Sequence, residues 1–312
     1  MSNEVARKNE AHLAELGDPE VWVKRTATGQ IRSVRAVINL REDQGELVEV
    51  EKKLTISAKG YRRANQIASL AILTPDTIQI PDADRGTIEV PNPYPIIDRE
   101  SGTQKGVWVK KIAVGYSPIG SIAVSSTTMF YDFSIYFLED LQSKIRWNEG
   151  AGRFCFRDQV TEEEKEKGIF MPIEGQFGVW ANTGHKEVLK AIGTWIQTKK
   201  FGERKAQTVA ERNVLKHHPA LALQLGTVAG PIGARVTQVS VIGWQHDHDA
   251  QELEQIALAA DAGDEVEVDG VVVEALDVSN QIDEVDVRAS IEGDVEDIQP
   301  SDEQEEVREG LF

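Results

Sequence analysis

The chain has 312 residues, of which 40% are hydrophobic, and a formal net charge of −18. This length fits one large domain or two ordinary ones, with enough apolar residues to fill a core. A single cysteine, Cys155, excludes an internal disulfide framework and fits a reducing compartment, so we expect a cytoplasmic protein. Neither an apolar run of about 18 residues nor an amino-terminal secretion signal is found, so we predict no membrane span.

The negative charge is concentrated at the carboxyl end of the chain. Residues 247–312 carry a net charge of −21, whereas residues 1–246 carry +3. Such asymmetry hints at nucleic-acid contact by the basic part. An ordinary domain with a solvated acidic tail has the same composition, so the charge alone leaves both interpretations open.

The first elements in chain order are a short helix and three strands. The helix is expected near residues 3–16, and the strands at 20–25, 33–40 and 46–56. Residues 41–45 (REDQG) have the composition of a hairpin loop, so we expect the last two strands to pair.

A basic amphipathic helix is predicted next, at residues 58–73, with Ser57 as its cap. Its apolar side carries Ile67, Leu70 and Ala71. The opposite side carries Lys59, Arg62, Arg63 and Gln66. A proline-rich segment at residues 80–95 then predicts a loop with little regular structure.

The densest β region lies in the middle of the chain. Residues 106–116, 120–129 and 130–141 predict an antiparallel meander, because apolar and polar residues alternate in the third segment. Residues 153–158 and 169–181 are expected to extend this sheet, with a short exposed helix or loop between them.

Two helices are predicted at residues 185–201 and 203–218, separated by Gly202. In the second, Ala206, Val209, Ala210 and Val214 form the inner stripe. Residues four apart form a row on another side, namely Arg204, Thr208, Arg212 and Lys216. The row is either a solvated face or a nucleic-acid contact, and the excess of cations over acids between residues 199 and 218 favours the contact.

A strand at residues 234–244, a helix at 249–261 and a hairpin around Asp269-Gly270 complete the folded part. Residues 277–312 hold isolated Val and Ile among acids, so they are expected to be disordered. The sequence therefore predicts an α+β fold, in which an antiparallel sheet packs against helices. Its parts are a body (1–246), an acidic helix with a short hairpin (247–276) and a disordered acidic tail (277–312).

Motifs for catalysis are mostly absent from the sequence. No phosphate-binding loop of the G-x-x-x-x-G-K-[ST] type occurs, and the glycine-rich residues 226–233 are better explained as a loop. His246 and His248 alternate with Asp247 and Asp249, which could bind zinc or manganese, although helix capping also explains the acids. We therefore expect no catalytic residue, no metal and no cofactor.

The order of elements resembles that of the phage single-strand annealing proteins, the RecT, Redβ and Erf group. The residues that carry the resemblance are the β-rich stretch 107–141 and the helix pattern KAQTVAER at 205–212. It covers roughly residues 20–245. It implies a basic groove lined by a sheet and helices, and homo-oligomeric rings or filaments on DNA. It also implies annealing in recombination without nucleotide hydrolysis, in the host cytoplasm if the chain is phage-encoded.

Contacts to the phosphates of single-stranded DNA are expected from lysine and arginine. The candidates are Lys59, Arg62, Arg63, Lys110, Lys111, Lys199, Lys200, Arg204, Lys205, Arg212 and Lys216. Tyr61, Trp108 and Tyr116 could stack on bases or lie in the core.

The last residues, EEVREGLF, look like the acidic tails of bacterial single-strand-binding proteins, which end in Phe. That likeness implies that Leu311 and Phe312 dock on a replication or recombination protein, steered by the acids. The alternative is that these two residues end the chain by accident.

Two other function classes remain open. A virion or assembly protein would equally explain the β-rich body, the acidic tail and the missing catalytic motifs. An enzyme that uses His246 and His248 is the third class.

Overall fold

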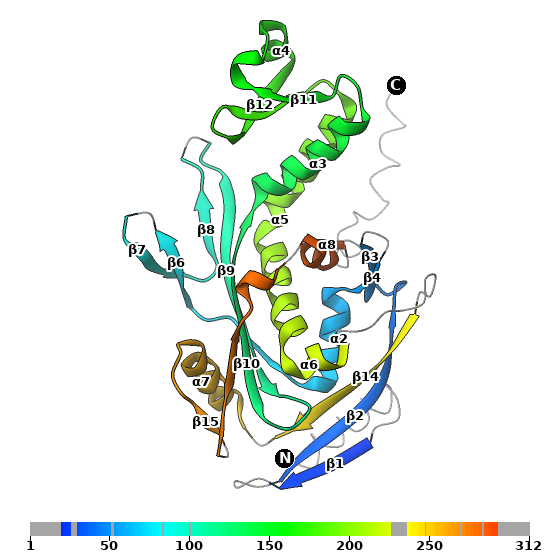
Figure 1. The fold of residues 1–312 in the computed structure, drawn as a ribbon, viewed down its shortest axis with the longest axis vertical. Helices are drawn as coiled ribbons and strands as arrows, with labels where there is room; N and C mark the ends of the chain where they lie inside the picture. The colour runs from blue at the N-terminus through cyan, green and yellow to red at the C-terminus, as the bar shows by residue number, and fades with distance from the viewer. Residues whose placement is uncertain are drawn as a thin grey trace, which may run out of the picture. The chain divides into compact units, whose positions relative to one another are not determined.

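The computed structural model describes residues 20–292, except 26–29, 51–52, 83, 100, 226–235, 247, 269 and 283. Helices and strands are mixed along the chain, which confirms the α+β class (Figure 1). The predicted helix at residues 3–16 lies outside the described residues.

The chain forms two compact units. The first contains Met1–Asn92, Val109–Met129 and Gln207–Phe312, and the second contains Pro93–Trp108 and Phe130–Ala206. Three elements continue from one unit into the other, namely β9 (Gln104–Tyr116), β10 (Ile122–Asp132) and α5 (Lys186–His217).

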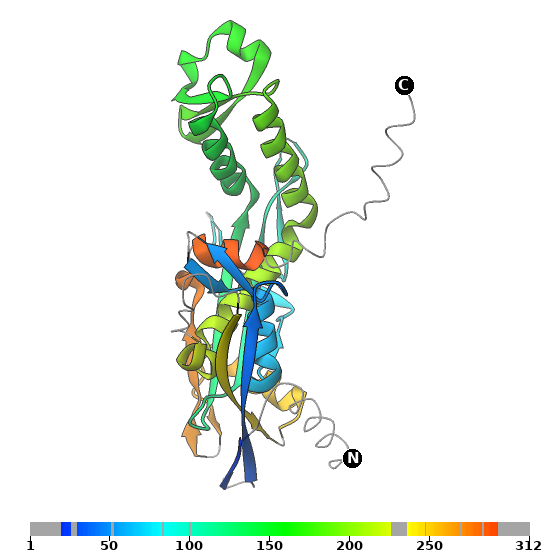
Figure 2. The same cartoon turned by 90° about the vertical axis from the view of Figure 1, so that its right-hand side faces the viewer.

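The first unit contains an antiparallel sheet in the order β1-β2-β14. Its strands, Glu20–Arg25, Gln30–Arg41 and Val236–Gln245, match predicted strands. In β2, Val34, Ala36, Ile38 and Leu40 are buried at every second position, as the pleat requires. Helices α2 (Ala58–Ala68) and α6 (Pro219–Leu225) lie beside this sheet in both views (Figure 1 and Figure 2) and close the core.

Helix α2 begins as predicted, with the Ser57 side chain accepting a hydrogen bond from Gly60 N at 3.1 Å. The predicted continuation to Leu73 is wrong, because the helix ends at Ala68 and Ser69 is left-handed at φ 59°. The side chain of Asn65 pairs with both backbone groups of Leu70, at 2.9 and 3.0 Å, and turns the chain outward. Residues Ala71–Leu73 form β5, which pairs with β9.

The predicted strand at residues 46–56 is a hairpin of its own, β3 (Leu47–Val50) and β4 (Lys53–Ile56). Its expected pairing with residues 33–40 is wrong. Strand β2 pairs instead with β1 on one edge and with β14, which is distant in sequence, on the other.

A second sheet of the first unit runs in the order β17-β10-β9-β5, with β17 (Glu274–Asp277) parallel to β10. Helix α7 (Ala250–Asp261) packs on it through Leu253 and Ile256. The predicted helix at 249–261 is confirmed, and so is the hairpin after it, β15 (Glu267–Val268) and β16 (Val271–Val272).

The predicted loop at residues 80–95 is largely strand. Hairpin β6 (Thr77–Asp82) and β7 (Gly86–Pro91) belongs to the first unit, where Ile78 is paired with Val90 and both are buried. Strand β8 (Tyr94–Ile97) belongs to the second unit and pairs with the first half of β9.

The second unit holds the largest departure from the predicted strands. The third strand of the meander was predicted at residues 130–141, but only residues 130–132 are strand, at the end of β10. The rest belongs to helix α3 (Phe133–Trp147). Asp132 caps this helix by accepting a hydrogen bond from Ser134 N at 2.8 Å. Phe133, Phe137 and Leu141, four apart, are its buried residues.

The strands after α3 form a separate sheet in the order β11-β13-β12 and do not extend the meander as predicted. They are Gly152–Phe156, Phe177–Asn182 and Gly168–Glu174, with a 3-10 turn (Arg157–Gln159) and α4 (Glu162–Lys167) between β11 and β12. The sheet packs on α3 and α5 through Val179 and Ala181. Cys155 is buried, as expected for a structural thiol.

Two more sequence predictions need correction. Helix α5 is continuous through Gly202, which was expected to separate two helices. Residues 277–292, expected to be disordered, include a 3-10 turn (Ser279–Gln281) and α8 (Glu284–Glu292), where Val278, Val287 and Ala289 are buried. The rest of the predicted tail lies outside the described residues. In the part of the chain that the structure describes, no helix is long and apolar enough to cross a membrane.

Candidate nucleic-acid interface

Three of the predicted phosphate-binding cations are already paired with carboxylates. Arg62 Nε lies 2.8 Å from Glu211, Arg63 Nη1 lies 2.6 Å from Glu46, and Lys110 Nζ lies 2.6 Å from Asp261. A phosphate would have to displace a carboxylate at each of them, which weakens the case for these cations as DNA contacts.

Lys111 is also a poor candidate for DNA contact. Its side chain is buried in the first unit and donates a hydrogen bond to Thr74 Oγ1 at 2.6 Å. Burial lowers the pKa of this lysine below its usual value, because the charged form loses its hydration.

The predicted row of Arg204, Thr208, Arg212 and Lys216 along α5 is not exposed along its whole length. The inner stripe of Ala206, Val209, Ala210 and Val214 is buried as expected. However, Thr208 and Arg212 of the row are also buried, with only 5% and 1% of their surfaces exposed. Around residues 206–214, α5 is therefore covered both on its apolar stripe and on the side that carries Thr208 and Arg212. The four residues of the row do not form a continuous exposed surface.

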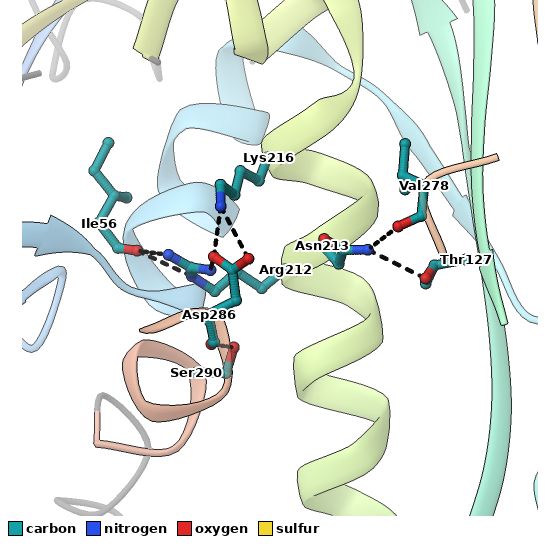
Figure 3. Close-up of polar contacts among 8 residues, drawn as sticks. All are labelled: Ile56, Thr127, Arg212, Asn213, Lys216, Val278, Asp286 and Ser290. Atoms are coloured by element: carbon teal, nitrogen blue, oxygen red, sulfur yellow. Dashed lines mark hydrogen bonds and ion pairs between the residues drawn. The ribbon is translucent and has the colours of Figure 1, made fainter. Parts of the chain in front are cut away.

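Arg212 is the centre of a buried polar cluster in the first unit (Figure 3). Its Nε and Nη2 donate to the carbonyl oxygen of Ile56 at 3.0 and 2.9 Å, and its guanidinium lies 5.3 Å from the ring centre of Tyr61. Its Nη1 pairs with Asp286 of α8, and Lys216 Nζ reaches the two oxygens of the same carboxylate at 2.7 and 2.9 Å. We call Arg212, Lys216 and Asp286 the Arg212 cluster.

The charges in this cluster determine the protonation of its members. Burial alone would raise the pKa of Asp286, but the neighbouring Arg212 and Lys216 outweigh it and hold that pKa below its usual value. Asp286 is therefore ionised near neutral pH. Burial raises the pKa of Tyr61 to about 12, so this phenol stays protonated.

Asn213 makes a second anchor from the neighbouring position on α5. Its Nδ2 donates to Thr127 Oγ1 at 3.1 Å and to the carbonyl oxygen of Val278 at 2.9 Å (Figure 3). Together with Asp286, it attaches the segment 278–286 to α5. Sequence reasoning missed both residues, although the apolar pair Val285 and Ala289, four apart, was a signal for a helix in this acidic stretch.

Four of the remaining candidates lie on the part of α5 that belongs to the second unit. We call Lys199, Lys200, Arg204 and Lys205 the α5 cation segment. Lys199 donates to Thr103 Oγ1 at 2.8 Å and lies 4.5 Å from the ring centre of Trp195, and exposed Lys200 lies over Phe201. Arg204 is exposed. Lys205 donates to Thr198 Oγ1 at 3.3 Å, and burial lowers its pKa.

Within the described residues, none of the four cations of this segment forms an ion pair with a carboxylate. Lys59, which is exposed on α2 of the first unit, has no described ion pair either. Four neighbouring cations without anionic partners give a positive local potential, which is what a phosphate backbone requires.

The aromatic residues proposed for base stacking are not available for it. Tyr61 and Tyr116 are buried, and Trp108 is half-buried with its ring 5.2 Å from that of Phe130.

Of the histidine pair near α7, His248 has polar partners, whereas the ring of His246 lies 5.3 Å from that of Tyr116. His248 lies 3.0 Å from the hydroxyl of Tyr116 and 2.9 Å from Glu252, and Asp249 caps α7 through Glu252 N. Among the residues that the structure describes, no group of three or more His, Cys, Asp or Glu side chains could hold a metal ion. Asp247, Leu311 and Phe312 lie outside those residues.

Comparison with protein-family models, with curated proteins and with solved structures finds no match to this chain.

Proposed function

We propose that the chain binds single-stranded DNA and promotes annealing of complementary strands without nucleotide hydrolysis. The observation that carries the binding part is the α5 cation segment, whose four cations lack carboxylate partners within the described residues. Binding of this kind is sequence-tolerant and depends on salt, because each phosphate contact releases counterions. The annealing part rests on the resemblance in element order and helix pattern.

The same proposal includes assembly and recruitment. Protomers form rings or filaments on the DNA, and Leu311 and Phe312 contact a replication or recombination protein. Both follow from the resemblances and stay predictions.

The first prediction tests the α5 cation segment. Changing Lys199, Lys200 and Arg204 to Gln should weaken binding of a labelled oligothymidylate at least about tenfold at about 50 mM salt. The slope of log affinity against log salt should fall by about 2, since a single strand contributes about 0.7 per lost contact. Fluorescence anisotropy over a salt series measures both quantities, and annealing of complementary oligonucleotides should slow in parallel.

The matched control removes three cations elsewhere in the second unit. Lys165, Lys167 and Lys190 are exposed, and two of them are paired with Glu162 and Glu187. Their change to Gln alters the net charge equally and should leave the salt slope unchanged. Equal slopes for both triple variants would contradict the proposal, and so would a wild-type chain that binds no oligonucleotide.

One observation favours the alternative, an assembly protein. Phe154, Phe156 and Phe177 are 42%, 51% and 38% exposed at one end of the β11-β13-β12 sheet. The ring of Phe177 lies 6.4 Å from that of Phe154 and 5.6 Å from that of Phe156, so the three form one aromatic patch. Exposed patches of this kind mark protein contacts.

The alternative is tested by sedimentation of the wild type and of a variant with these three residues changed to Ser. Loss of a wild-type oligomer with unchanged oligonucleotide binding would favour assembly as a separate function. A monomeric wild type would remove the alternative.

A further inference from the structure

Arg212 is held in place by groups other than its anionic partner. Two of its nitrogens bind the carbonyl oxygen of Ile56, and Tyr61 lies beside the guanidinium. Only Nη1 is directed to Asp286. Arg212 would therefore keep its orientation if α8 left, and its side chain is preorganised for an anion.

Helix α8 is attached by apolar contacts and by ion pairs. It has nine residues, of which Val285 and Ala289 pack on Val48 and Val50 of β3, and Val287 is also buried. A helix of this length is not stable alone in water, so its folding depends on docking. The ion pairs of Asp286 with Arg212 and Lys216 add to the apolar contacts that hold α8 on the unit.

The space beside the cluster is large enough for a bound group. A cavity of about 350 Å³ is lined by Ile56, Tyr61, Arg212, Lys216 and Asp286, together with other residues of β4, α5 and α8. One wall of this cavity is therefore α8 itself. Withdrawal of α8 would leave Arg212 and Lys216 facing the vacated space.

We propose that Arg212 and Lys216 form a phosphate-binding site, which α8 occupies through the carboxylate of Asp286. A phosphate offers the same acceptor oxygens to an arginine and a lysine as this carboxylate does. Exchange of one anion for the other leaves neither the buried Arg212 nor the partly exposed Lys216 unpaired, which avoids the cost of an uncompensated buried charge. Helix α8 therefore blocks the site until a phosphate displaces it. That this phosphate belongs to a DNA backbone rests on the proposed function.

Thermodynamic linkage supplies a test on the wild-type chain. If a phosphate ligand and α8 compete for one site, each must weaken binding of the other by the same factor. Hydrogen exchange of amides 284–292 should therefore accelerate when inorganic tripolyphosphate or oligothymidylate is added. Unchanged exchange at a concentration that saturates binding would overturn the proposal.

Substitutions of Asp286 and Lys216 test the same site. Asp286→Asn removes the competing charge and should strengthen tripolyphosphate binding at least about tenfold. Asp264→Asn, an exposed acid after α7, is the matched control and should behave like the wild type. Asp286→Asn with Lys216→Met should lose the gain, because the second cation is gone. Isothermal titration calorimetry measures all four chains.

A second variant displaces α8 by another change, in case Asp286→Asn does not fold. Ala289 is fully buried against β3, so Ala289→Asp should displace α8, and Asp286 with it, while Arg212 and Lys216 themselves are unchanged. It should give the same gain in phosphate binding, with the circular dichroism of the remaining fold retained.

The two probes separate this site from the proposed function. A Lys216-dependent gain for tripolyphosphate without oligonucleotide binding by any chain would keep the site and remove the DNA proposal. No gain for either probe in both Asp286→Asn and Ala289→Asp would overturn the site, whatever the wild type does with DNA.

Discussion

His218 shows how a single residue departs from the behaviour of its type. A histidine after the last turn of a helix is usually favoured as a cation by the helix dipole. Here Nδ1 accepts a hydrogen bond from Ala220 N at 3.1 Å, and Nε2 lies 2.9 Å from the carbonyl oxygen of Ala123. The imidazole is therefore neutral with its proton on Nε2. Burial lowers its pKa from 6.5 to about 4.

This residue gives a prediction for stability against pH. Between pH 6.5 and about 4 the unfolded chain binds a proton at His218 that the folded chain does not. The free energy of unfolding should therefore fall as the pH falls through this window, by about 3 kcal/mol from this group. Urea unfolding at a series of pH values measures it.

The variant His218→Gln should flatten the dependence of unfolding on pH in that window, because the titrating group is gone. The control His185→Gln, in the second unit, should keep the wild-type dependence. Identical curves for the wild type and His218→Gln would show that His218 does not cause the effect.

At the scale of elements, α5 shows why a helix can pass through a glycine. Gly202 is buried, and a Cβ built on it would overlap the ring of Phe133, itself fully buried on α3. The glycine therefore provides a close approach of two helices. Gly193 on the same helix is exposed and has open space around its Cβ position.

These two glycines predict opposite effects of alanine. Gly202→Ala should destabilise the second unit by about 1 to 3 kcal/mol, because the methyl group overpacks against Phe133. Gly193→Ala should stabilise it by up to about 1 kcal/mol, since alanine is the better helix former. Chemical denaturation of both variants checks the pair, and a stabilising Gly202→Ala would contradict the packing argument.

At the scale of the whole molecule, the acidic carboxyl-terminal region is partly a structural component. Residues 250–292 contribute α7 to a core, β17 to a sheet and α8 to the Arg212 cluster. A chain that ends at residue 246, the predicted end of the body, would lose all three.

Truncation makes this a measurable prediction. A chain that ends at Glu292 should unfold at the same temperature as the full chain. A chain that ends at His246 should lose about 3 to 6 kcal/mol from Leu253 and Ile256 of α7 alone, because both side chains are buried. Equal melting temperatures for all three chains would show that residues 250–292 add nothing to the core.

The sequence by itself determined the features that depend on neighbours along the chain. The strand predicted at residues 33–40, the Ser57 cap of α2, the inner stripe of α5 and the Asp249 cap of α7 are all local, and each is confirmed. The same applies to buried Cys155, whose neighbours Phe154 and Phe156 face the other way.

The polarity pattern gave a wrong element where it is compatible with both a strand and a helix. Residues 130–141 alternate in polarity like a strand, yet Phe133, Phe137 and Leu141 also have helical spacing, and packing in the second unit selects the helix. The predicted pairing of residues 33–40 with 46–56 failed for another reason. One neighbour of β2 is β14, about 200 residues later in the chain, and a local pattern does not indicate such a distant partner.

Only the tertiary structure decided which cations can meet a ligand. Composition identified the basic positions, but Arg63 pairs with Glu46, Arg62 with Glu211, Lys110 with Asp261, and Arg212 with Asp286. Each of these partners is distant in sequence, and a charge interaction depends on separation in space and on burial. The fold therefore paired five of the eleven predicted cations with carboxylates, among them Arg212 and Lys216 with Asp286. It left the α5 cation segment and Lys59 without a described ion pair.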